Sequence, residues 1–146
     1  LGSPVFFYKS IIIAMRRYFF FIILLLTSIF FLTDCKNSFS DGKYLYEIHC
    51  QSCHMPDGIG LKGIIPPLAE SDYLKNNYDK LPCIILLGVE GEMVVNGKTY
   101  NQPMAGIPEL ATMDVALIIN YINHQWGNDG KYTDFREVEA NLKKCE

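Results

Sequence analysis

Two cysteines and a histidine stand at fixed spacing in the segment Cys50-Gln51-Ser52-Cys53-His54. Two thiols separated by two residues can form thioether bonds to the two vinyl groups along one edge of a porphyrin, and the histidine that follows then lies beneath the iron. A neutral imidazole nitrogen is a good ligand for that iron. The spacing therefore predicts a covalently attached c-type haem, held by Cys50 and Cys53, with His54 as one axial ligand.

Two other kinds of site use a cysteine pair at this spacing. A thioredoxin-like dithiol normally lies beside a βαβ unit, and the folded residues before Cys50 do not read as a strand. A zinc site needs a second pair of ligands at metal-binding spacing. The remaining cysteines and histidines are instead scattered or unpaired along the chain: Cys35, Cys83, Cys145, His49 and His124. The haem is the favoured interpretation, with the dithiol and zinc sites as alternatives.

A second axial ligand is predicted further along the chain. Met104 follows His54 by 50 residues, so the chain is long enough to cross the haem edge and return on the other face. A thioether is a soft, neutral ligand that raises the reduction potential when it lies opposite a histidine. Methionine is also a common core filler, but Met104 lies in Asn101–Gly106, which we expect to be an irregular polar loop. We predict Met104 as the ligand and Met93 as the reserve candidate.

The segment after His54 is rich in glycine and proline. Its composition predicts a loop with tight, preset turns that wraps the histidine side of the cofactor. Because proline has no N–H, a carbonyl near Pro66 or Pro67 is free to accept the proton on the non-coordinating nitrogen of His54. The alternative for either proline is a plain rigid turn.

Capping residues and apolar spacing predict helices around this site. The predicted helices run from Ser40 or Asp41 to Ile48, over Ser71–Leu74, over Leu81–Leu87 with Gly88 at its end, from Met113 to Trp126 with Thr112 as cap, and through Phe135, Val138 and Leu142 in the tail. Asn96-Gly97, flanked by β-branched and aromatic residues, predicts a two-residue hairpin over Glu92–Tyr100. The expected fold class is all-α with a small inserted β-hairpin.

The chain from Met15 has the layout of a secretory signal peptide. Arg16-Arg17 is followed by an apolar run, Tyr18 to Leu32,. A longer run, Ile11–Phe31, could instead be an uncleaved membrane anchor, although arginines at its centre would oppose insertion. The arginine pair predicts export of everything after Cys35.

The residues Leu32-Thr33-Asp34-Cys35 resemble the lipobox of bacterial lipoproteins, in which the cysteine is lipidated. Asp34 departs from that pattern, which has a small residue at this position. We expect an extracytoplasmic (periplasmic) protein that is anchored to the membrane through lipidated Cys35 or through the uncleaved N-terminal segment.

The charge of the exported part limits the kinds of partner it can have, and its cysteine count bears on a disulfide. From Cys35 onward there are ten basic and fifteen acidic residues, a net charge of −5, which argues against nucleic acid as a partner and suits a basic or neutral protein. Cys83 and Cys145 are the cysteines left after haem attachment and lipidation. In an oxidising compartment this count motivates the hypothesis that they form a disulfide.

From about Asp41 to Asn128 the order of these signals resembles a class I, mono-haem c-type cytochrome. The motifs that carry the resemblance are Gly42, Tyr46, Cys50-x-x-Cys53-His54, Asp57-Gly58-x-Gly60, Pro66-Pro67-Leu68, Ser71-Asp72-Tyr73-Leu74, Val95-Asn96-Gly97, Tyr100-Asn101-x-Pro103-Met104 and Trp126-Gly127. The resemblance implies that Gly42 and Tyr46 pack near Tyr121 and Ile122, and that Pro66 is the better placed proline. It implies a cofactor-binding set that adds Pro66, Leu68 and Tyr100 to the attachment motif.

Four segments follow from this reading: 1–34, upstream residues plus signal; 35–40, a tether; 41–130, a cytochrome c domain; and 131–146, a tail helix. We expect an electron carrier for an oxidase, reductase or dehydrogenase, because two protein ligands leave the iron without a vacant position. The alternatives are a peroxidase-like or gas-binding haem protein with a displaceable sixth ligand, and a thiol–disulfide protein. No nucleophile, base and orienting group stand at legible spacing for hydrolysis.

Overall fold

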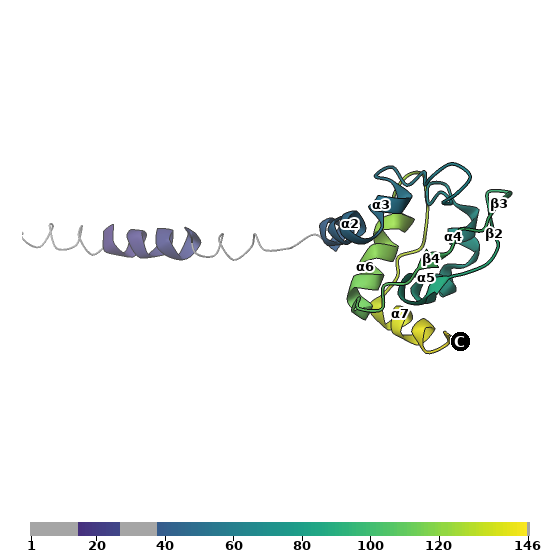
Figure 1. The fold of residues 1–146 in the computed structure, drawn as a ribbon. Helices are drawn as coiled ribbons and strands as arrows, with labels where there is room; N and C mark the ends of the chain where they lie inside the picture. The colour runs from purple at the N-terminus through teal and green to yellow at the C-terminus, as the bar shows by residue number, and fades with distance from the viewer. Residues whose placement is uncertain (1–14, 27–37, 146) are drawn as a thin grey trace, which may run out of the picture. The chain divides into compact units, whose positions relative to one another are not determined.

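A computed structural model describes residues 15–26 and 38–145 of the chain. Residues 15–26 form a helix that belongs to one compact unit, Leu1–Lys36, and the remainder belongs to a second, Asn37–Glu146 (Figure 1). No helix within the described ranges is long and apolar enough to cross a membrane. The lipobox and Cys35 lie outside the described residues, so the lipid anchor stays a prediction.

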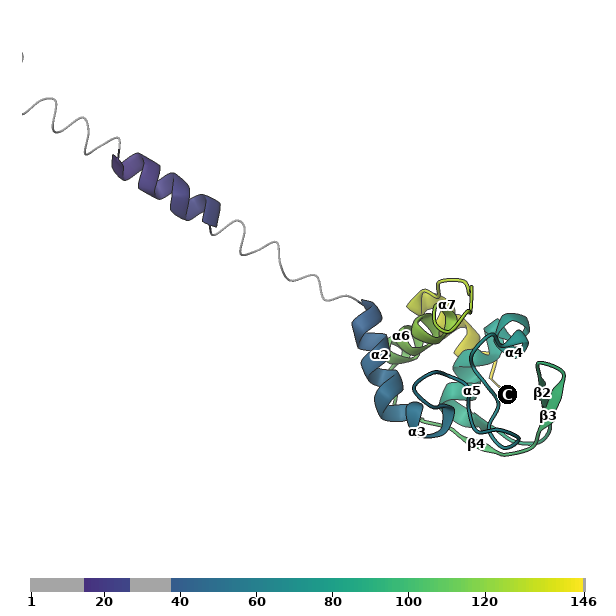
Figure 2. The ribbon, with the colours of Figure 1, turned by 90° about the horizontal axis from the view of Figure 1, so that it is seen from above.

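The second unit is mainly helical, as predicted. Its helices are α2 (Ser38–His49), α3 (Gln51–His54), α4 (Asp72–Asn76), the 3₁₀ turn η1 (Tyr78–Lys80), α5 (Leu81–Leu87), α6 (Thr112–Asn123) and α7 (Phe135–Leu142). α2 crosses α6 and packs against it, and α5 also packs against α6 (Figure 2). The all-α fold class is thereby confirmed.

Within residues 38–145, four short strands form two separate antiparallel pairs. β2 (Met93–Val95) and β3 (Lys98–Tyr100) form the predicted hairpin, and both turn residues, Asn96 and Gly97, have the positive φ that a type I′ turn requires,. β1 (Gly88–Val89) pairs with β4 (Met104–Ala105). The second pair corrects the expectation that Asn101–Gly106 is irregular throughout.

The crossing of α2 and α6 is close because Gly42 has no side chain. A Cβ atom at this position would lie 2.4 Å from the carbonyl oxygen of Leu117 and 3.0 Å from Cβ of Tyr121. One turn later, Tyr46 is only 1% exposed, and its ring centroid lies 5.4 Å from that of Tyr121 and 5.1 Å from that of Trp126. These contacts confirm the implied packing of Gly42 and Tyr46 against Tyr121, and aromatic pairs at such separations add to area burial.

The apolar face of α6 forms the centre of the core. Val115, Ile118, Ile119 and Ile122, which recur at three- and four-residue intervals, are all buried, whereas Trp126 at the next such interval is half-buried,. The predicted C-terminus was wrong, because α6 ends at Asn123 and Trp126 lies beyond it with a positive φ.

Two predicted helix starts are also displaced. The N-cap of α6 is Ala111, not Thr112, and the Asp114 carboxylate accepts from the Ala111 N–H at 3.2 Å. α2 begins at Ser38, so that Ser40 and Asp41 lie in its first turn instead of capping it. Helix starts are set by which nearby oxygen reaches the free N–H groups, and several polar residues compete for that role here.

The tail helix α7 packs against α5 and α6. Its start is capped by Asp134, whose carboxylate accepts from the Arg136 N–H at 2.8 Å, and Val138 on its apolar face is fully buried. A disulfide between Cys83 and Cys145 joins α5 to the residues after α7. This bond confirms the hypothesis that the cysteine count motivated.

The Gly42 contact yields a stability prediction. In Gly42→Ala the added methyl group must push the Leu117 carbonyl away, so we expect the free energy of unfolding to fall by about 1–3 kcal/mol. Chemical denaturation of the purified protein measures this loss. Lys43→Ala is the control, because Lys43 makes only an exposed ion pair with Glu47 and should change stability by less than about 1 kcal/mol. Equal effects of the two substitutions would contradict the proposed crossing.

Candidate functional site

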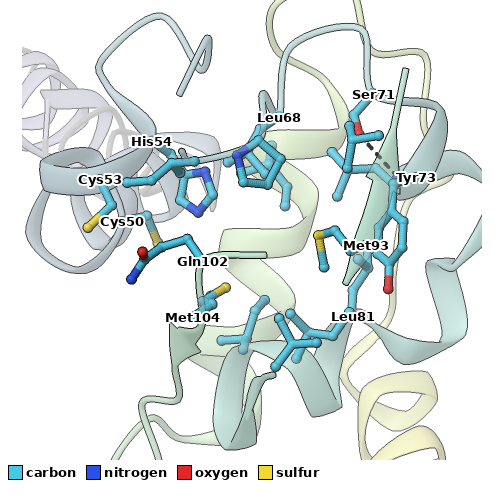
Figure 3. A pocket seen from close by; sticks show the side chains of 18 of the residues that line it. Cys50, Cys53, His54, Leu68, Ser71, Tyr73, Leu81, Met93, Gln102 and Met104 are labelled. Atoms are coloured by element: carbon cyan, nitrogen blue, oxygen red, sulfur yellow. Dashed lines mark hydrogen bonds between the residues drawn. The ribbon is translucent and has the colours of Figure 1, made fainter. Parts of the chain in front are cut away.

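A cavity of about 650 Å³ lies between α3 and the loop that follows it on one side and α5, β2 and β4 on the other (Figure 3). Most of its lining is apolar and includes Leu68, Leu81, Ile85, Val95 and Ile118. This volume and this lining are typical of sites for a small molecule or prosthetic group.

α3 and the preceding residue, Cys50, present both thiols and the imidazole to this cavity. The N–H groups of Cys53 and His54 donate to the Cys50 carbonyl at 3.1 and 2.9 Å, which closes the turn. Cys50 is half-buried and Cys53 is exposed, and neither is in a disulfide. Burial, and secondly the neighbouring Cys53, raise the pKa of Cys50 to about 11. A reactive dithiol needs a lowered thiol pKa, so this environment does not favour the thioredoxin-like alternative.

The imidazole of His54 is a buried polar group on the cavity wall. Its side chain points into the cavity (Figure 3), and the residue is 8% exposed. Burial lowers the pKa of His54, and the Pro66 backbone carbonyl beside the ring opposes that shift. Nδ1 has no hydrogen bond of ordinary geometry within the described part of the chain. Buried polar atoms are rarely left without a partner. The unpartnered Nδ1 therefore distinguishes the His54 ring from the core residues around it.

The loop after α3 brings Pro66 to the histidine. The Gly60 N–H donates to the His54 carbonyl at 3.1 Å, and Leu61 and Ile65 form a bridge that turns the chain back. Gly60 has a φ of +66°, and a Cβ atom there would lie 2.4 Å from the Ile65 oxygen and 2.6 Å from the Pro66 oxygen. Only glycine, which has no Cβ atom, lets these two segments of the loop approach so closely.

The tyrosine of the α2–α6 crossing also fixes this loop. The hydroxyl group of Tyr46 donates to the carbonyl of Met55 at 2.6 Å, in the residue directly after His54. Met55 itself has a φ of +65°, so the chain turns sharply at this point. The hydrogen bond therefore connects the helix crossing to the backbone that carries the imidazole.

Met104 enters the same cavity from the opposite side. It lies on β4, where it is paired with Val89 of β1, and its side chain points into the cavity below His54 in Figure 3. It also borders a smaller pocket of about 390 Å³ next to Glu90. The reserve candidate Met93, the first residue of β2, lines the larger cavity as well.

The structure brings together six of the seven predicted site residues. Those that line the cavity are Cys50, Cys53, His54, Pro66, Leu68 and Met104. Tyr100 is buried at the end of β3 but is not part of the lining. The sequence reasoning missed four polar lining residues, His49, Ser71, Tyr73 and Gln102. Gln102 could have been found from its place in the Pro-Met segment, whereas the others depend on how α2 and α4 face the cavity.

The zinc alternative finds no support in the described ranges. Residues 15–26 and 38–145 contain no group of three or more histidine, cysteine, aspartate and glutamate side chains placed to hold a metal ion. Cys50, Cys53 and His54 therefore do not form such a group themselves.

Comparisons with known proteins give a family and two relatives. The family model for cytochrome c matches residues 39–126. Cytochrome c-552 of Thermus thermophilus is 30% identical over 105 residues, which cover 69% of this chain and 79% of the relative. A second cytochrome c-552, from a particular strain of the same organism, is likewise 30% identical over 105 residues, which cover 69% of this chain and 70% of that protein. The family match includes every cavity residue named above and ends before α7.

The loop geometry yields a prediction with a matched control. Gly60→Ala adds a methyl group that clashes with two carbonyl oxygens at a positive φ, whereas Gly97→Ala has the same backbone problem with no atom within 4 Å. The backbone strain alone costs about 1–2 kcal/mol, and the clash adds about 1–3 kcal/mol. We therefore expect denaturation to show a larger loss for Gly60→Ala. A loss no larger than that of Gly97→Ala would contradict the close packing of the loop.

Proposed function

The chain belongs to the cytochrome c family, and from this membership we propose that it carries single electrons outside the cytoplasm through one covalent haem c with His54 and Met104 as axial ligands. The observation that carries the proposal is that an imidazole and a thioether from segments 50 residues apart face one apolar cavity from opposite sides. The two free thiols lie on the wall of the same cavity.

The residues present fit this cofactor. Haem supplies the redox-active iron when it is bound, and the apolar lining matches its large apolar faces. The unpartnered Nδ1 of His54 faces the neighbourhood of the Pro66 carbonyl. A small movement of that carbonyl would let it accept the Nδ1 proton, which orients an axial histidine and makes it a better ligand. Cys50 and Cys53 would hold the porphyrin edge, and Leu68 would exclude water from its face.

Two protein ligands favour a carrier over an enzyme. With His54 and Met104 on the iron, substrate has no open coordination position, and the axial pair tunes only the potential. The smaller pocket behind Met104 is the observation that favours the alternative, a haem protein that binds a gas or peroxide, because it offers the thioether space to move aside. The ligand substitution below separates the two functions.

We also propose a redox-protein partner and a membrane anchor. A weak, transient interface of small area is typical of electron-transfer complexes, and the exposed Cys53 marks the edge at which the cofactor would approach solvent. The net charge of −5 from Cys35 onward suits a basic or neutral partner,. Lipidation of Cys35 would tether the domain through the segment 35–40.

Replacement of the sixth ligand tests the function. In Met104→Ala we expect the methionine-to-iron charge-transfer band of the oxidised protein to disappear and the midpoint potential to fall, within the roughly 0.8 V over which axial ligands tune haem. Met93 lines the same cavity. The control variant Met93→Ala should keep both the charge-transfer band and the midpoint potential. Absorption spectra and redox titration measure them, and carbon monoxide should bind rapidly only to reduced Met104→Ala. Rapid binding to the unaltered protein would favour the gas-binding alternative.

Replacement of Cys35 tests the anchor. A radioactive fatty acid supplied to cells should label the unaltered protein and Cys83→Ser, a matched cysteine substitution, but not Cys35→Ser. Label incorporation is measured after purification under denaturing conditions. If the unaltered protein takes up no label and its amino terminus precedes Cys35, the membrane attachment is an uncleaved segment instead.

A further inference from the structure

The disulfide joins a residue inside the family match to one outside it. Cys83 lies on α5, within the matched residues 39–126, whereas Cys145 follows α7, beyond them. α7 is held against the domain by more than this bond: Val138 is fully buried, and Asn120 of α6 exchanges two hydrogen bonds with the backbone of Thr133, at 2.7 and 2.9 Å. The tail is therefore packed into the domain as part of its fold.

The helix that carries Cys83 forms part of the cavity. Leu81, Ile84 and Ile85 of α5 line the side opposite His54. Cys83 and its disulfide therefore hold α5 from the tail side while its neighbours in the helix face the haem site.

α5 is also the support of the strand that carries Met104. It continues directly into β1, where Gly88 pairs with Ala105 and Val89 pairs with Met104. Just after β4, the Ile107 N–H donates to the Ile85 carbonyl at 2.9 Å.

Two glycines make this contact unusually close. A Cβ atom on Gly88 would lie 2.3 Å from the Met104 oxygen, and one on Gly106 would lie 2.4 Å from the Leu86 oxygen. The backbone of β4 therefore lies directly against the end of α5, and a shift of α5 must shift Met104.

We propose that Cys83 and Cys145 are positioning residues for the sixth ligand. The disulfide and α7 hold α5, α5 holds β4, and this chain of contacts limits how often the Met104 thioether leaves the iron. The inference rests on the proposed ligation by Met104. The loop that the disulfide closes, with its ends 62 residues apart in sequence, contains all four strands, so its closure restrains every segment on the methionine side.

A purely stabilising disulfide would behave differently. It would raise the free energy of global unfolding without changing local opening at Met104, because the two are separate equilibria. The rate at which Met104 dissociates, measured far below the unfolding temperature, distinguishes the two roles.

The experiment uses imidazole as a probe of the oxidised holoprotein. At saturating imidazole, the rate of its binding to iron is limited by dissociation of Met104. In Cys83→Ser/Cys145→Ser we expect this limiting rate to rise about fivefold or more, the lower end of typical coupling between sites. Tyr121→Leu is the control, because it loosens the aromatic contacts among α2, α6 and Trp126 and should lower the melting temperature without changing the rate. An unchanged rate in the double variant, or an equal rise in Tyr121→Leu, would overturn the proposal.

A second measurement needs no substitution and remains available if the double variant does not fold. Ascorbate reduces the iron of the unaltered protein and leaves the disulfide closed, whereas a phosphine reductant opens the disulfide as well, which two new thiols per chain would verify. We expect carbon monoxide to bind the phosphine-treated protein about fivefold faster or more. Equal rates for the two samples would overturn the proposal.

Failure of the inference can be told apart from failure of the proposed function. If the unaltered protein binds imidazole as fast as Met104→Ala, Met104 is not the ligand and the proposed ligation fails. If the unaltered protein is much slower than Met104→Ala and opening the disulfide has no effect, only the positioning role of Cys83 and Cys145 fails.

Discussion

The close crossing of α2 and α6 is the contact on which the cavity depends. Gly42 lets the two helices approach to backbone contact, and Tyr46 then fills the space between Tyr121 and Trp126. Because the Tyr46 hydroxyl donates to the Met55 carbonyl, the crossing also sets where the chain leaves α3. The position of the His54 imidazole thus follows from how two helices pack at some distance from it.

The cavity lies within the apolar core of a small domain. A domain of about a hundred residues has little apolar surface to spare, and Leu81, Ile85 and Ile118 of its buried apolar cluster also line the cavity. The buried Nδ1 of His54 adds an unpartnered polar atom,. Both features fit the haem c that membership of the cytochrome c family implies.

The sequence predicted those elements whose geometry is set by neighbouring residues in the chain. Asn96-Gly97 specifies its own turn, and Ser71 caps α4 by accepting from the Leu74 N–H. The attachment motif needs only one helical turn, so its geometry was predictable as well. These features depend on residues within a few positions of one another.

Other features depend on residues far away in the sequence and could not be predicted. The sequences of β1 and β4 show no alternation of apolar and polar residues, because strands of two residues are too short for it. Their pairing depends on the close approach of the backbone at Gly88 and Gly106. α6 ends early because the Asn128 side chain donates to the carbonyls of Ile122 and Leu68, a contact between segments 60 residues apart. The two sides of the candidate site differ in the same way. The spacing of the motif itself places His54 relative to the two thiols, whereas Met104 is placed by tertiary contacts with β1 and with the end of α5. A change in the packing of α5 should therefore shift Met104 before it shifts His54.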